Sequence, residues 1–210
     1  MTTDTDLLKR AAAERAVELI TSGTVVGLGT GSTMQPLLDA LARRLREGTV
    51  RNVIAVPTSE ATAQRCRTLG IPLATLDEYP ELALAVDGAD EVDRRLNAIK
   101  GMGGAMLREK VVALAAKRFV LVVDESKLVR RLGTRGPVPV EVVPFGWSAL
   151  IPFFEKLGAE PALRCGPGGE PYVTENGNYV VDCRFARGIG RARVGKECSS
   201  PCRSRWSPYH

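Results

Sequence analysis

The sequence predicts an α/β fold in which a doubly wound, mostly parallel, Rossmann-like sheet precedes a smaller α+β second domain. Short apolar runs alternate with amphipathic helical patterns over the first 130 of the 210 residues, which is typical of βαβ units. The apolar runs are near-continuous, as expected for strands buried on both faces. Beyond residue 131 the stretch LGTRGPVPV is rich in glycine and proline, which indicates a link between two domains.

The first domain, over residues 1–130, is expected to alternate helices and strands in a regular order. A helix over 4–20 comes first, with an apolar stripe and with Gly23 as its stop. Further helices are expected at 34–46, 59–69 and 104–117, and strands at 25–26, 52–56, 71–74, 82–86 and 119–123. In such sheets ligands bind at the carboxyl ends of the strands. The loops that follow the strands are therefore the candidate binding loops.

The second domain, over residues 131–185, is expected to be the first two thirds of a split β-α-β-β-α-β unit. Its expected elements are a strand at 138–143, a helix at 147–157, a strand at 160–164 and a hairpin over 172–185 that turns at Asn176-Gly177. Residues 186–210 show neither a helical nor an alternating period. We therefore expect a disordered basic tail and a second domain that is incomplete at its C-terminus, with reduced stability or solubility as the consequence.

The excess of basic charge belongs to this tail. The net charge is +5, yet seven of the 29 Lys and Arg residues and only one of the 24 acidic residues lie from Arg184 onward. The body of the chain therefore gives no ground for nucleic-acid binding. A metal-binding role for Cys198, Cys202 and His210 is disfavoured, because their spacing fits no standard zinc pattern. His210 is the only histidine, which excludes internal histidine catalysis and His-rich metal sites.

The remaining composition predicts a cytoplasmic protein without membrane segments. There is no apolar run of 18 residues, and the N-terminal MTTDTDLLKR does not have the pattern of a signal peptide. The five cysteines are scattered and form no CxxC pair, which favours a reducing compartment over a disulfide framework.

The stretch from Asp87 to Lys110 holds the densest group of chemically useful residues. Four carboxylates follow the apolar run LALAV, and Lys100 precedes a glycine turn from which a helix carrying Glu109 begins. Backbone amides at such a turn can stabilise an oxyanion or a phosphate, and a carboxylate on the helix can act as a general base. The alternative is an ordinary acidic loop followed by a solvated helix residue. The four carboxylates are Asp87, Asp90, Glu91 and Asp93.

The segment GLGTGST, residues 27–33, is a candidate phosphate cradle. Its glycines follow an apolar strand, and Ser32 and Thr33 open the next helix. It is neither a dinucleotide fingerprint nor a Walker A loop, because its third glycine comes one residue early and no G-K-[ST] follows. Taken alone, it could be a tight turn without a ligand. However, the polar loops at 27–33, 57–59, 87–90 and 124–127 all follow strand ends, which favours one shared binding edge.

These motifs resemble those of the ribose-5-phosphate isomerase, type A, family. The segments GLGTGST, VPTSEAT, VDGADEVD, KGMGGAMLREK, DESK and PVEVVP occur in that family's order and spacing over roughly residues 6–185. The family interconverts ribose 5-phosphate and ribulose 5-phosphate through an enediolate, in the non-oxidative branch of the pentose phosphate pathway. The resemblance implies an aldose–ketose isomerase that uses no metal and no cofactor. It further implies a homodimer or homotetramer that binds a small sugar phosphate, and neither nucleic acid nor membrane.

The resemblance also implies roles for particular residues. Glu109 would be the base that carries a proton between C1 and C2, and Asp87 and Asp90 would assist ring opening and the transfer of hydroxyl protons. Lys100 would stabilise the enediolate oxygen. The substrate and its phosphate would be held by Thr30, Gly31, Ser32, Thr33, Asp87, Gly88, Ala89, Asp90, Lys100, Gly101, Met102, Gly103, Lys127 and Lys9. Such an isomerase needs one base, one oxyanion site and one phosphate anchor, and no histidine.

Two features depart from the family pattern, and two other functions stay open at this point. Met102 stands where the family usually has glycine and is expected to crowd the turn, and the pattern stops after about Phe185. A non-catalytic sugar-phosphate sensor would keep the phosphate loop without needing Glu109, although no helix-turn-helix segment precedes residue 20. A CoA-transferase-like enzyme of similar architecture would use a glutamate as nucleophile and would need a nucleotide-sized site.

Overall fold

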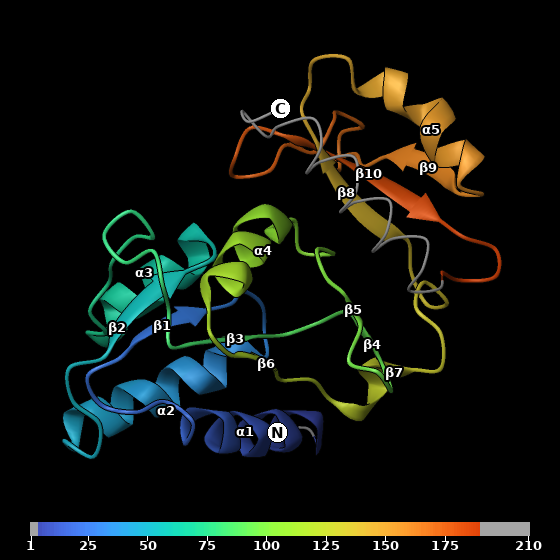
Figure 1. Cartoon of the computed structure of the whole chain (residues 1–210). Helices are drawn as coiled ribbons and strands as arrows, with labels where there is room; N and C mark the ends of the chain where they lie inside the picture. Colours follow the sequence, from blue (N-terminus) through green and yellow to red (C-terminus); the bar gives the residue numbers. More distant parts are fainter. Residues whose placement is uncertain (1–3, 190–210) are drawn as a thin grey trace, which may run out of the picture. The chain divides into compact units, whose positions relative to one another are not determined.

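The computed structural model describes residues 4–189, which form two compact units (Figure 1). The first unit contains the described residues up to Ala89 together with Gly101–Lys127, and the second contains Asp90–Lys100 and the described residues from Leu128 onward. The sequence predicts a single domain boundary near residue 130. It does not predict that the segment Asp90–Lys100 belongs to the second unit. No helix in the described part of the chain is long and apolar enough to cross a membrane.

A four-stranded parallel sheet forms the centre of the first unit, which confirms the predicted fold class. Its strand order is β2-β1-β3-β6, with β1 at Val25–Leu28, β2 at Ile54–Pro57, β3 at Leu84–Asp87 and β6 at Phe119–Leu121. Every neighbouring pair is parallel. The expected strand at 71–74 is reduced to one bridge between Leu73 and Ala55. Pro72 contributes a carbonyl to Ala55 but has no N–H with which to extend the ladder.

Helices cover both faces of this sheet. They are α1 (Asp4–Val17), α2 (Met34–Arg46), α3 (Glu60–Leu69) and α4 (Met106–Ala115). Successive strand residues point to opposite faces. Val26 and Val86 pack in one core with buried residues of α1 and α2, whereas Ala85 packs on the other side with Val112 of α4. A Cβ on Gly27 would overlap the Val112 side chain, so a glycine here lets α4 approach β1 closely.

Helix α3 has the two ends that the sequence predicts. Ser59 is its N-cap, and the Ser59 hydroxyl accepts a hydrogen bond from the Thr62 amide at 3.2 Å. Gly70 ends the helix in the left-handed region at φ 73°. By contrast, α2 has no side-chain cap, although Thr33 occupies its N-cap position.

The larger sheet of the second unit is antiparallel, in the order β8-β10-β9. Its strands are β8 (Val138–Val142), β9 (Glu160–Leu163) and β10 (Tyr179–Arg184), and η2 (Trp147–Leu150) leads into α5 (Ile151–Lys156). The expected turn at Asn176-Gly177 forms, with Gly177 at φ 75°. The first arm of that hairpin is not a full strand, because only the bridge between Val173 and Tyr179 forms.

The segment expected to be an acidic loop forms part of a second, smaller sheet. Its order is β5-β4-β7, with β4 at Glu91–Asp93, β5 at Ala98–Ile99 and β7 at Leu128–Val129, the last directly after η1 (Glu125–Lys127). β4 pairs antiparallel with β5 and parallel with β7. Glu91 and Val92 are both buried and Asp93 is half-buried, so this short strand has no alternating pattern that the sequence could show within its run of carboxylates.

The structure differs from the expected tail at its first four residues. The chain turns after Phe185, where the Gly188 amide donates to the Phe185 carbonyl. Ile189 is 5% exposed and its amide donates to the Leu132 carbonyl at 2.7 Å. Burial of Ile189 with Ile99 and Leu132 explains this order. Residues 190–210, on which the rest of the expected tail falls, lie outside the described part of the chain.

Candidate active site

Asp87 ends β3 at the carboxyl edge of the parallel sheet, and its carboxylate organises the loop after β1. The side chain is 2% exposed. Its Oδ1 accepts hydrogen bonds from the amides of Thr30, at 3.2 Å, and Gly88, at 2.7 Å. A Cβ on Gly29 would overlap this carboxylate, so only glycine allows the acid and the loop to share the space. The spacing of the glycines therefore has a steric reason at the predicted site.

The loop Thr30–Thr33 presents polar groups at the start of α2. Gly31 has φ 111° and is exposed, as is Ser32. No acceptor in the described part of the structure receives a hydrogen bond from the amides of Gly31, Ser32 or Thr33. Amides without such an acceptor at a helix start are suited to an anion such as a phosphate.

Three hydroxyl side chains that are not among the predicted site residues form hydrogen bonds with this loop and with Gly29 before it. The Thr30 hydroxyl lies 2.8 Å from the hydroxyls of both Thr58 and Ser59, at the end of β2. Thr62 donates its hydroxyl proton to the Gly29 carbonyl at 2.8 Å. Thr58, Ser59 and Thr62 are buried. The sequence marks 57–59 as one of the candidate binding loops, because parallel strand ends share one edge, and Thr62 lies in the first turn of the helix that follows.

Glu109 lies on α4, and the packing of α4 against β3 places it at the same edge of the sheet. Val112 packs against Ala85 of β3, and Glu109 lies one helical turn before Val112 on the same face. α4 connects two parallel strands and runs antiparallel to them, so its N-terminal turn lies toward the strands' carboxyl ends. Asp87 lies two residues beyond Ala85 in that direction. Both acids therefore lie at one edge, and Glu109 is only 7% exposed. The interpretation of Glu109 as a solvated helix residue is wrong.

The glycine turn before α4 is formed by strained backbone that glycine accommodates. Gly101 has φ 106° and Gly104 has φ 83°, and the Gly104 amide donates to the Gly101 carbonyl. The expected crowding by Met102 is not seen, because Met102 is 37% exposed and a Cβ on Gly103 would meet no atom within 4 Å. Helix α4 begins at Met106, two residues later than expected.

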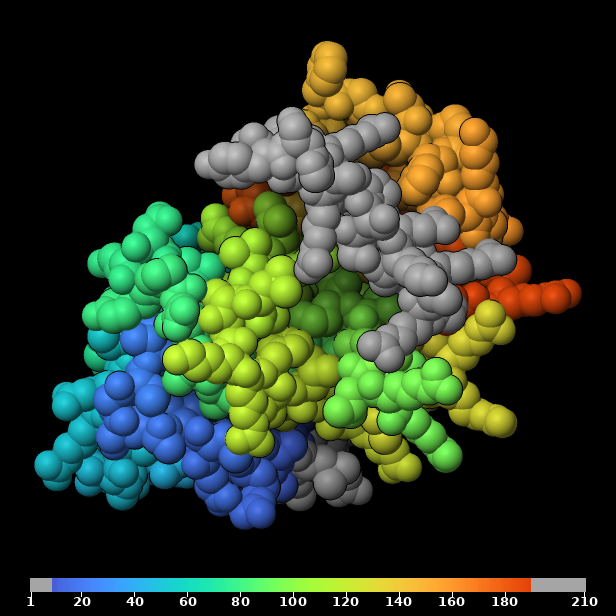
Figure 2. All heavy atoms as spheres, in the orientation of Figure 1, coloured from blue at the N-terminus to red at the C-terminus, as the bar shows by residue number. Residues whose placement is uncertain are grey.

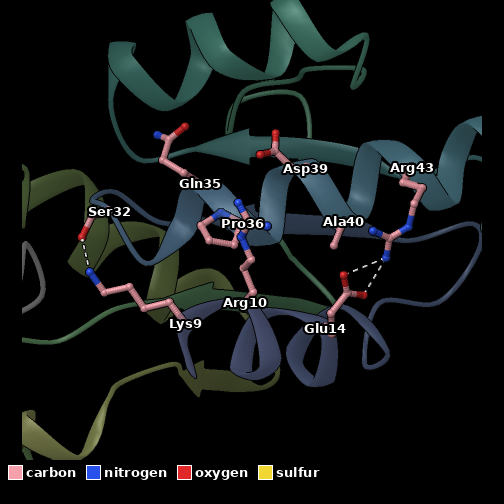
Figure 3. A pocket seen from close by; sticks show the side chains of 9 residues that line it. All are labelled: Lys9, Arg10, Glu14, Ser32, Gln35, Pro36, Asp39, Ala40 and Arg43. Carbon is pink, nitrogen blue, oxygen red and sulfur yellow. Dashed lines mark hydrogen bonds and ion pairs between the residues drawn. The ribbon is translucent and has the colours of Figure 1, made fainter. Parts of the chain in front are cut away.

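Two lysines converge on one acid of the first unit. The Lys9 ammonium donates to the Ser32 hydroxyl at 3.3 Å (Figure 3). The pKa of Asp124 is lowered, first by the Ser126 hydrogen bond and also by the charges of Lys127 and Lys9. Both predicted phosphate-binding lysines therefore lie within electrostatic reach of Asp124. Lys9 and Ser32 also line a groove of about 500 Å³ between α1 and α2, which Glu14 and Arg43 close with an ion pair (Figure 3).

Asp90 and Lys100 belong to the second unit, where they are neighbours. Glu91 of β4 pairs with Ile99 of β5, and the Asp90 amide donates to the Ile99 carbonyl at 2.9 Å. The antiparallel pairing thus brings the residues that flank it, Asp90 and Lys100, next to each other. They are covalently joined to Ala89 and Gly101, the first-unit residues on either side of the segment.

These features place the first unit in the class of Rossmann-like α/β proteins that bind small ligands at the carboxyl edge of a parallel sheet. Residues 54–200 match the family described as Ribose 5-phosphate isomerase A (phosphoriboisomerase A). Because that match covers more than half of the sequence, the chain belongs to the ribose 5-phosphate isomerase A family.

Individual relatives agree with this assignment. Ribose-5-phosphate isomerase A of Roseiflexus castenholzii is 55% identical over 182 residues, which cover 87% of this chain and 78% of the relative. The solved ribose 5-phosphate isomerase A of Methanocaldococcus jannaschii is 39% identical, with a TM-score of 0.86 and coverage of 94% of this chain and 87% of that one. A D-ribose-5-phosphate isomerase in complex with phospho-erythronic acid is 39% identical, with a TM-score of 0.83 and coverage of 86% and 80%.

Proposed function

We propose that this protein is an aldose–ketose isomerase that interconverts ribose 5-phosphate and ribulose 5-phosphate through an enediolate, with Glu109 as the base. The observation that carries the assignment of the base is the shared position of Glu109 and Asp87 at the carboxyl edge of the sheet, beside the Thr30–Thr33 loop. Neither the sensor nor the CoA-transferase alternative has a specific observation in its favour. A non-catalytic sensor would leave the buried Glu109 without a proton to move.

The proposed chemistry moves two protons. The Glu109 carboxylate removes the proton from C2 of the open-chain aldose, and the electrons of that C–H bond form the C1–C2 double bond while the C1 carbonyl becomes an oxyanion. Glu109 then returns the proton to C1, and the O2 hydroxyl proton passes to O1, which leaves a carbonyl at C2. Asp87 and Asp90 are the proposed carriers of hydroxyl protons and the groups that assist ring opening. Lys100 and the amides of the Gly101–Gly103 turn would stabilise the oxyanion.

The proposed phosphate anchor combines dipoles with two cations. The amides of Gly31, Ser32 and Thr33 at the start of α2 would donate hydrogen bonds to phosphate oxygens. Lys9 and Lys127 would supply the positive charge, supported by their common proximity to Asp124. The complex of a homologous D-ribose-5-phosphate isomerase with phospho-erythronic acid supports a phosphorylated ligand of sugar size. Gly88, Ala89 and Met102 complete the proposed substrate contacts.

We also propose that the protein assembles as a homodimer or homotetramer and acts in the cytoplasm. Each unit has apolar side chains that a monomer would leave in water. Leu107, Val111 and Leu114 form an exposed stripe along α4, whose yellow-green segment lies at the surface in Figure 2. In the second unit Phe145 is 96% exposed. Apolar surface of this kind is typical of subunit interfaces. Light scattering after size-exclusion chromatography tests the assembly, and a monomer would contradict it.

The direct test of the activity is to follow ribose 5-phosphate by NMR in D₂O with a chelator present. We expect ribulose 5-phosphate to appear with solvent deuterium at C1, because a base that exchanges with solvent carries the proton. A chain that binds the sugar phosphate without converting it would favour the sensor. Transfer of an acyl group from a CoA thioester, with no isomerisation, would favour the CoA-transferase alternative.

A further inference from the structure

The smaller sheet of the second unit places two pairs of arginines side by side. β4 and β7 are parallel, in a register that pairs Asp93 with Val129. Arg94-Arg95 directly follows β4, and Arg130-Arg131 directly follows β7. Parallel pairing in this register therefore brings the two cationic pairs to the same end of the sheet.

These four arginines line a pocket of about 470 Å³, together with Asp93, Asn97, Leu132 and Ile189. All four are exposed, and none forms an ion pair with any of the described side chains. Leu132 and Ile189 are buried and provide an apolar floor. The pocket has the volume of sites that hold small organic ligands.

The carboxylate of Asp93 is held in place by hydrogen bonds within its own turn, so it cannot move to form an ion pair with each arginine. Oδ1 accepts the amides of Arg95, at 2.8 Å, and Asn97, at 2.9 Å, and Oδ2 accepts the Asn97 side-chain amide at 2.8 Å. The pKa of Asp93 is lowered, first by that side-chain hydrogen bond, so the group stays ionised. One fixed negative charge thus faces four guanidinium groups.

The tip that carries Arg94 and Arg95 is held in one conformation. The Asp93 hydrogen bonds close the turn between β4 and β5, and Leu96 lies in the left-handed region at φ 61°. A leucine in that region is sterically disfavoured, and the closed turn must offset this strain. Cations held in a fixed turn need less reorganisation on binding than cations on a mobile loop.

Four converging guanidinium groups repel one another, and an anion that binds among them relieves this repulsion. Arginine presents paired N–H groups that match phosphate oxygens, and a multiply charged phosphate can contact more than one arginine at once. We propose that this arginine pocket binds a small phosphate anion with several charges, of the diphosphate or triphosphate type. None of its lining residues belongs to the proposed sugar-phosphate site.

Isothermal titration calorimetry of the full chain with inorganic pyrophosphate tests the proposal. The titration is run in low salt, with ribose 5-phosphate and ribulose 5-phosphate present at saturating, equilibrated concentrations so that the active site is filled. We expect one pyrophosphate per chain. The double variant Arg94→Ala/Arg130→Ala should bind at least about 100-fold more weakly, because it removes two charged contacts and each is worth roughly one decade or more.

The matched control is the double variant Arg46→Ala/Arg118→Ala, which removes two exposed arginines from the first unit. It should bind pyrophosphate as the unmodified chain does, and both double variants should retain the melting temperature and the isomerase activity measured without pyrophosphate. Equal weakening by the two double variants would show nonspecific charge attraction and overturn the proposal. Loss of binding when the sugar phosphates are added would assign the anion to the active site instead. If a single-stranded oligonucleotide bound this pocket more tightly than pyrophosphate does, the proposed ligand would be wrong and the pocket would be a nucleic-acid site.

Discussion

The carboxylate of Glu91 accepts a hydrogen bond from the Gly133 amide at 2.6 Å, across 42 positions of the sequence. It also accepts the amides of Arg135, at 2.9 Å, and Gly136, at 3.1 Å, and the side chain is 2% exposed. Three amides around one buried carboxylate fix the loop 133–136 against β4. Asp90 directly precedes Glu91, and Lys100 directly follows Ile99, the strand partner of Glu91. The hydrogen bonds of the Glu91 carboxylate therefore also fix the positions of Asp90 and Lys100, the two proposed site residues of the second unit.

Glu91→Gln should destabilise the protein by roughly 1–3 kcal/mol, because a neutral side chain cannot accept all three amides and at least one is left without its acceptor. Urea unfolding measures the change, and Glu160→Gln, at an exposed position of β9, is the matched control, with no expected effect. We expect kcat to fall as Asp90 and Lys100 lose their fixed position. Unchanged unfolding and unchanged kcat together would contradict this account of Glu91.

Glu109→Gln should lower kcat by ~10²–10⁴-fold, the contribution of a general base, because the amide cannot take a proton from carbon. KM should change little, since the substitution keeps the size of the side chain and leaves the phosphate anchor intact. Steady-state kinetics on ribose 5-phosphate separates the two constants. Lys110→Gln, at the exposed neighbouring position, is the control. Near-full turnover by Glu109→Gln would remove the assignment.

Lys127→Ala should raise KM for ribose 5-phosphate by about 10–100-fold, because a lost charged hydrogen bond to phosphate is worth roughly 1.5–3 kcal/mol. Lys117→Ala removes an exposed lysine of the same unit and should leave KM unchanged. The same variant assayed on unphosphorylated ribose should show no further loss. If the unmodified chain processes ribose as well as its phosphate, the anchor is wrong.

The sequence predicts the parallel sheet and the polar loops at its carboxyl edge well, because both depend on local patterns. Apolar runs such as Leu82–Val86 and the glycines after β1 can be recognised in the sequence itself. The reason for glycine at position 29 is a single contact, with the Asp87 carboxylate. Placing Glu109 needed the contact of Val112 with Ala85 in addition to the helix period and the direction of the strands.

The parts that could not be predicted depend on contacts between distant residues. Glu91 looks like one acid among four, and only its pairing with amides more than 40 positions away shows that it is structural. The same holds for Ile189, whose partner is Leu132, and for the parallel pairing of β4 with β7. Short strands of two or three residues carry too little periodicity to be recognised in the sequence.

The cysteines of the described residues should differ strongly in reactivity. Burial raises the pKa of the Cys66 and Cys183 thiols to about 11 in each case, whereas Cys165 is exposed. At pH 8 the two buried thiols therefore hold at least about 100-fold less thiolate than an ordinary exposed thiol. Brief alkylation with iodoacetamide followed by peptide mass spectrometry should find Cys165 modified and the buried pair unmodified.

The raised pKa values of the Cys66 and Cys183 thiols also predict that the folded protein becomes less stable at high pH. In the unfolded chain the thiols lose their protons near pH 8.5, whereas the folded protein keeps them to about 11. The folded state therefore binds more protons in this window, and stability falls as pH rises from about 8.5 to about 11. Urea midpoints at pH 7.5 and 10 should show this fall. The double variant Cys66→Ala/Cys183→Ala, compared at the same two pH values, should lose less stability between them. An equal fall in both proteins would assign the effect to other groups.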